Sequence, residues 1–138
     1  MRHLFFFSLL LILPSGDAVS QEKHPFDIEK VPVYPGCVGN NNEELKQCLM
    51  SKIMAHIGDN FNTDIPSGSD LEGRQRIEVL FVISSEGKVA QVEATGPHPS
   101  LEAEAVRVVE SLPQMEAGEQ EGKKVTIQYA LPIIFHVK

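Results

Sequence analysis

The strongest hydrophobic pattern in the chain lies near its carboxyl end, at residues 125–137. Every second residue there is apolar or aromatic, which places these side chains on one face of a β-strand. Pro132 falls on the opposite face and has no amide hydrogen to donate, so we expect this strand at the edge of a sheet. An exposed edge either needs protection or accepts a strand from a partner. The alternating positions are Val125, Ile127, Tyr129, Leu131, Ile133, Phe135 and Val137.

Two earlier stretches repeat apolar residues with the spacing of a helix. The first follows the cap residues 40–42 and ends near Gly58, and the second begins at Ser100 and is stopped by Pro113. Each pattern predicts an amphipathic helix with one buried stripe. The stripes are Leu45, Leu49, Ile53 and Ile57 in the first helix, and Leu101, Ala105, Val108, Val109 and Leu112 in the second.

A hairpin is predicted between the two helices. Residues 76–83 are apolar on both faces, which is typical of an inner strand, and residues 89–95 alternate as a second strand. Gly87, in the turn between them, can take a positive φ. The order helix, hairpin, helix, strand predicts an α+β fold in which two helices pack on one face of a three-stranded antiparallel sheet.

The first 20 residues have the pattern of a secretory signal peptide. Arg2 supplies a positive charge, residues 4–13 form an apolar core, and small residues precede a cut that we expect after Ser20. An uncleaved anchor is the alternative, although the apolar run is shorter than the roughly 20 residues that span a bilayer. Residues 21–36 are polar, interrupted by prolines and typical of a leader or linker, in which Val31, Val33 and Tyr34 are the residues that could touch the core. We therefore expect one domain at residues 37–138.

Charge and motif content narrow the classes of function. The formal net charge of −7 argues against nucleic acid or an anionic membrane surface as a partner. His24, His56, His98 and His136 show no metal-ligand spacing, and no serine lies in a nucleophile elbow. We therefore expect no metal, no cofactor and no enzymatic activity.

Cys37 and Cys48 are the two cysteines of the chain, and both follow the predicted signal peptide. In an oxidising compartment a pair this close in sequence favours a disulfide, which would pin the loop before the first helix onto that helix. A redox-active or metal-binding pair is the alternative, although the spacing is not Cys-x-x-Cys.

Short motifs run in order through the last part of the chain. They are Phe81-Val82-Ile83, Glu86-Gly87-Lys88-Val89, Gly96-Pro97-His98-Pro99-Ser100-Leu101, Glu104-Ala105-Val106-Arg107-Val108-Val109, Ser111-Leu112-Pro113, Gly118-Glu119-Gln120, Gly122-Lys123 and Leu131-Pro132-Ile133-Ile134-Phe135. Together, over roughly the last 80 residues, they resemble the C-terminal domain of TonB in the form common in Bacteroidetes-type bacteria.

The resemblance implies a fold and a partner. In that family two helices pack on a three-stranded antiparallel sheet, and the exposed last strand accepts a short peptide, the TonB box, from an outer-membrane transporter. A periplasmic, non-enzymatic interaction module associated with transmembrane transport is therefore expected. A homodimer formed through the same edge, and a redox protein using the cysteine pair, remain alternatives. The residues implied in partner docking are Val125, Ile127, Tyr129, Leu131, Pro132, Ile133 and Phe135.

The chain also departs from the family pattern. We expect neither a membrane anchor nor a long proline-rich spacer in this chain, so we do not expect it to transmit inner-membrane force by itself. Met115 stands where many members carry a tryptophan, and Ala117 replaces the usual proline.

Overall fold

The computed structural model describes residues 28–64 and 71–137. The predicted signal peptide, its cleavage after Ser20 and the first part of the predicted linker lie outside the described residues. Neither helix within the described ranges is both long and apolar enough to cross a bilayer.

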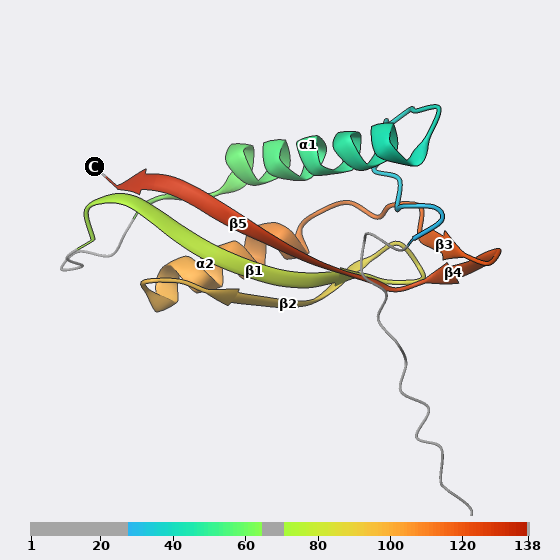
Figure 1. Cartoon of the computed structure of the whole chain (residues 1–138). Coiled ribbons are helices and arrows are strands. Elements are labelled where there is room, and N and C mark those ends of the chain that lie inside the picture. The colour runs from blue at the N-terminus through green and yellow to red at the C-terminus, as the bar shows by residue number, and fades with distance from the viewer. Residues whose placement is uncertain (1–27, 65–70, 138) are drawn as a thin grey trace, which may run out of the picture.

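Three antiparallel strands form the main sheet. They are β1 (Gly73–Ile83), β2 (Val89–Thr95) and β5 (Ile127–Val137), in the order β2-β1-β5. The central position of β1 agrees with its apolar residues on both faces. β5 pairs only with β1 within the sheet, so the last strand lies at an edge, as its proline predicted (Figure 1).

Two helices cover one face of this sheet. α1 (Asn42–Asn60) begins at Asn41, whose side chain accepts a hydrogen bond from the amide of Glu44 at 2.9 Å. α2 (Pro99–Glu110) begins at His98 rather than at Ser100, because the His98 ring accepts from the Ser100 amide and Pro99 suits the first helical turn. Figure 1 shows α1 along the β5 side of the sheet and α2 behind the strands. The predicted α+β fold class is confirmed.

The core lies between the two helices and the sheet. Its fully buried side chains come from both predicted helical stripes and from alternating positions of the strands. The largest of them are Phe81, Leu49, Ile53, Ile77, Ile83, Leu101, Ile127 and Leu131.

A small second sheet was not predicted. β3 (Gly118–Gln120) and β4 (Lys123–Val125) form a hairpin through Glu121 and Gly122, which both have positive φ. The predicted strand at 125–137 is therefore two strands. Val125 ends β4, and β5 starts after Thr126.

The segment 28–33, here called the N-terminal strap, is part of the folded unit. Ile28 and Val31 are 6% and 2% exposed, and Lys30 forms an antiparallel bridge with Glu119. These residues lie in the stretch that the sequence assigned to a linker. A linker would leave such apolar side chains in water, whereas here they close one end of the core.

Candidate strand-docking edge

The β1–β2 hairpin fixes the direction of the backbone groups of β1. Ser84, which follows β1, donates its N–H to the carbonyl of Lys88 and accepts from the N–H of Gly87, each at 2.8 Å. Both backbone groups of Ser84 therefore face β2. Because backbone groups of successive strand residues point to alternate sides, Ile83 and every second residue before it face β5.

The same alternation shows in which direction the backbone groups of Pro132 point. Glu78 lies an even number of residues before Ser84, so its backbone groups face β2, and its partner on β5 is Pro132. A pair of this kind exchanges no hydrogen bonds between β1 and β5. Pro132 therefore points its ring nitrogen at the free edge, where the missing amide hydrogen removes no bond from the sheet.

Five residues of β5 direct their backbone groups away from β1. They alternate with the residues bonded to β1, and no other described strand pairs with them. Four of them offer an N–H and a carbonyl, while Pro132 offers a carbonyl without an N–H. We call this row of groups the β5 edge, made of Gln128, Ala130, Pro132, Ile134 and His136.

Most of the docking residues implied by the sequence face the core rather than the free edge of β5. Ile127, Tyr129, Leu131 and Ile133 are buried, with exposures of 0–5%, and their side chains contribute to the core. Phe135 is partly buried against the core. Their backbone groups face β1, so the groups that a guest strand can reach belong to the residues between them. Pro132 carried the signal that sequence reasoning missed, because residues at even spacing from it share its backbone direction.

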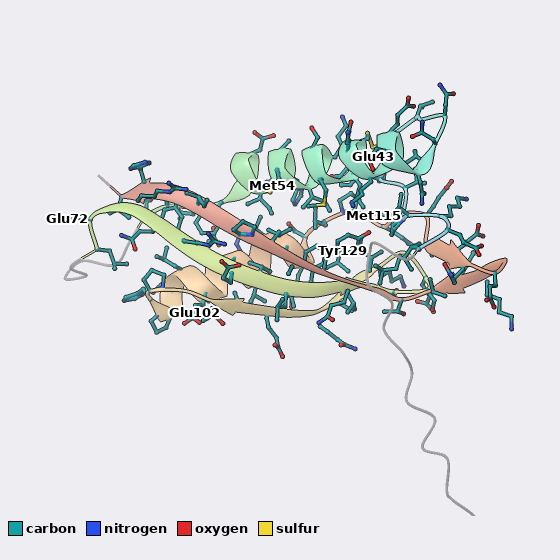
Figure 2. All side chains as sticks on the ribbon, viewed as in Figure 1. Glu43, Met54, Glu72, Glu102, Met115 and Tyr129 are labelled. Atoms are coloured by element: carbon teal, nitrogen blue, oxygen red, sulfur yellow. A yellow bond between two sulfur atoms is a disulfide. The ribbon has the colours of Figure 1, made fainter. Side chains whose placement is uncertain are left out.

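A hollow of about 280 Å³ lies beside the second half of β5. The end of α1 forms its other wall, and Met54 lies on the side of α1 that is turned toward β5 (Figure 2). The rings of Phe61 and Phe135, with centroids 5.4 Å apart, form part of the same wall. We call this hollow the edge pocket; its lining is Met54, Ile57, Gly58, Phe61, Thr63, Ile133, Ile134 and Phe135.

Few charges lie on the β5 edge. None of its five residues carries a carboxylate, although the chain is acidic overall. On the adjacent strand Arg76 forms an ion pair with Glu78, while exposed Arg74 lies opposite His136. The second half of the edge is therefore neutral to basic.

Tyr129 is the buried polar group nearest in sequence to Pro132. Among the described residues its hydroxyl has no hydrogen-bond partner, and its ring stacks on Phe81 with centroids 5.7 Å apart. Burial raises the pKa of Tyr129 to about 12, because the phenolate would lose its hydration. The side chain therefore stays neutral and fills space in the core.

The predicted disulfide is confirmed. Cys37 and Cys48 are joined at an S–S distance of 2.01 Å, and Cys48 lies on α1 as predicted. A second hollow, of about 440 Å³, borders Cys37 between the segment 33–37 and the segment 114–116. Within the described part of the chain, no three histidine, cysteine or acidic side chains gather as a metal site would require.

Comparison with known families supports the resemblance noted from the motifs. The family described as Gram-negative bacterial TonB protein C-terminal matches residues 69–137. This match covers the main sheet, α2 and the small hairpin, while α1 and the disulfide precede it. No curated protein sequence matches the chain. By the family match and the agreement of the fold, the chain belongs to the TonB C-terminal family, whose domains are periplasmic protein-interaction domains of transport energy transduction.

Proposed function

We propose that this protein binds an extended segment of an outer-membrane TonB-dependent transporter by adding that segment as a fourth strand to the β5 edge. Domains of the family generally interact with such transporters. The observation that carries the proposal is the row of backbone groups on β5 that face away from β1. Unpaired groups along an open strand are the template for strand addition.

The opposite edge of the sheet, β2, is less suited to strand addition, which supports the choice of β5. β2 pairs with β1 with a register shift between Leu80 and Val82, and Gln91 of β2 has a φ of +50°. Such an irregularity twists an edge and interrupts its ladder, which protects it against strand addition. β5 pairs with β1 without a shift along its whole length, so its outer side is the more regular template.

Amide hydrogen exchange tests the proposal. The outward amides of Gln128, Ala130, Ile134 and His136 are expected to exchange rapidly in the free protein, because no sheet partner holds them. Addition of synthetic peptides copied from the periplasmic segments of such transporters is expected to slow their exchange. The amides of the residues between them, already bonded to β1, are expected to change little.

A proline substitution provides the matched control. Ala130→Pro removes a second outward N–H while leaving the bonds between β1 and β5 in place, as Pro132 already does. We expect peptide binding to weaken about tenfold, whereas Ala130→Val keeps the amide and binds normally. Peptide binding that protects amides elsewhere and not on the β5 edge would contradict strand addition at this site.

A further inference from the structure

We infer that the edge pocket selects a partner segment carrying a bulky apolar side chain followed or preceded immediately by an acidic one. This inference rests on the proposed strand addition and specifies which segments the edge prefers. The apolar residue would enter the edge pocket, and the acidic neighbour would lie beside His136 and Arg74 on the other face of the sheet.

The geometry of a guest strand leads to the apolar position. Side chains of adjacent strands that lie opposite each other point to the same face. A guest residue opposite Ile133 or Phe135 therefore points to the helix-covered face, where both of these side chains line the edge pocket. Met54 is 43% exposed at this place. A bulky apolar guest side chain would cover Met54 and remove its apolar surface from water.

The alternation of side chains along the guest strand determines where its acidic residue lies. The guest residue next to the apolar one points to the opposite face of the sheet, beside His136. Arg74 lies across from His136 on β1, is exposed, and takes part in no ion pair among the described residues. None of the five residues of the β5 edge carries a carboxylate, so an acidic guest residue meets less repulsion here than over most of a chain with a net charge of −7, although exposed Glu72 lies two residues before Arg74.

A second copy of the chain does not fit the same site. If two β5 edges paired antiparallel about Pro132, the copy would place Tyr129 or Leu131 near the edge pocket. These side chains already occupy the core of their own subunit, so they would leave the pocket empty. The pairing would also bring in two prolines, each lacking an outward N–H, instead of one.

Gly58 offers a direct test of the apolar position. It lines the edge pocket from α1, and a Cβ built on it meets no atom of the described residues within 4 Å. Gly58→Leu can therefore fill the pocket without disturbing the fold, and Gly58→Ala is the matched control that leaves most of the volume open. Both substitutions remove a helix-interior glycine, so both variants are expected to be at least as stable as the parent.

The probes are ten-residue synthetic peptides of alternating valine and threonine that contain one Phe-Glu pair, made in both chain directions. Companion peptides replace Phe by Ala, or Glu by Lys. With the parent protein the Phe peptide is expected to bind about tenfold more tightly than the Ala peptide. Gly58→Leu is expected to abolish that preference, and Gly58→Ala to keep it.

Arg74 tests the acidic position in the same way. Arg74→Glu is expected to reverse the preference between the Glu and Lys peptides by several-fold, and Arg74→Gln to remove it. Equal affinity of the parent for Phe and Ala peptides that do protect the outward amides would overturn this inference and leave the proposed strand addition standing. Failure of every peptide to protect those amides would overturn both.

Discussion

At the residue scale, Gly87 has a role that its place in a turn does not reveal. It has a φ of +79°, and a Cβ on it would lie 1.8 Å from the carbonyl oxygen of Met115. The Met115 amide donates to the Gly87 carbonyl at 2.9 Å, so the turn is held against the segment that follows α2. The sequence predicted the positive φ but could not predict this close approach, because Met115 is distant in the chain.

Gly87→Ala is expected to lower the free energy of unfolding by about 3 kcal/mol or more, from left-handed strain and overlap with backbone atoms. Gly36→Ala is the matched control, since Gly36 has a φ of +87° and no atom of residues 28–64 or 71–137 lies within 4 Å of the added Cβ. There we expect a loss of about 1 kcal/mol. Urea denaturation measures both values, and equal losses would show that the Met115 contact has no effect.

Tyr129→Phe is expected to leave the free energy of unfolding unchanged or raise it by about 1 kcal/mol. The reason is that its buried hydroxyl finds no hydrogen-bond partner in the described part of the chain and contributes only a desolvation cost. Tyr34 is the other tyrosine, so absorbance can follow the ionisation of each in the single variants. Because the pKa of Tyr129 is raised in the folded state, the parent loses stability above about pH 10, and Tyr129→Phe should reduce that loss. A marked loss of stability in this variant at neutral pH would reveal a bonded hydroxyl.

At the element scale, a polar network joins the end of α1 to α2. The Glu104 carboxylate accepts from Arg107 at 2.8 Å and from the Asn62 amide at 2.7 Å, and Arg107 also donates to the carbonyl of Asn60 at 3.0 Å. The hydrogen bond from Arg107, and then that from Asn62, lowers the pKa of Glu104. The network holds the segment beyond α1 that lines the edge pocket.

This network predicts a dependence on pH. A carboxyl with a lowered folded-state pKa stabilises the fold above its ordinary value of 4.5, and the contribution is lost as the pH falls through the folded-state value. Glu104→Gln is expected to be less stable than the parent by roughly 1 kcal/mol at pH 7. The difference should disappear in acid, as measured by thermal unfolding across pH 2–7. Glu102 lies on the same helix and forms no hydrogen bond or ion pair among the described residues, so Glu102→Gln is the control for the loss of a carboxylate alone.

The elements differ in how far the sequence could predict them. α1, α2 and the β1–β2 hairpin were predictable because each has its own periodicity, cap or turn residues. The β3–β4 hairpin was not, since strands of three residues are too short to show alternation and depend on pairing with the N-terminal strap. For the candidate site, the sequence identified β5 and its edge position. It did not identify which residues face outward, or the edge pocket, whose walls come from distant segments.

At the scale of the whole molecule, the N-terminal strap extends the folded unit beyond the predicted domain start at Cys37. Asn42 of α1 bonds the strap twice, since its side chain accepts from the Val31 amide and donates to the Ile28 carbonyl, each at 2.9 Å. The strap thus connects α1 to the β3–β4 hairpin.

A protein that starts at Cys37 is expected to lose about 3 kcal/mol or more of stability relative to one that starts at Gln21, because Ile28 and Val31 no longer cover the core. Denaturant unfolding of the two forms measures the difference. Ile28→Ala in the longer form should show part of the same loss. Equal stability of the two forms would mean that the strap contributes nothing to the fold.

The disulfide acts on the same end of the molecule. Replacing Cys37 and Cys48 together by serine is expected to lower the free energy of unfolding by about 2–3 kcal/mol, because the disulfide closes a short loop. Peptide binding at the β5 edge should be unchanged once the variant is folded, because the bond lies at the other end of α1 from the edge pocket. Loss of binding in the folded variant would instead favour a functional role for the cysteine pair.

Pro132 has a consequence for the lifetime of any strand bound to the β5 edge. Its ring divides the outward hydrogen-bond donors into two short runs, Gln128 with Ala130 and Ile134 with His136. A bound strand can therefore lose its hydrogen bonds to one run while the other run still holds it. Dissociation then proceeds in two steps, each of which breaks only a few hydrogen bonds. A strand bound as proposed is therefore expected to dissociate faster than a strand held by an unbroken row of donors.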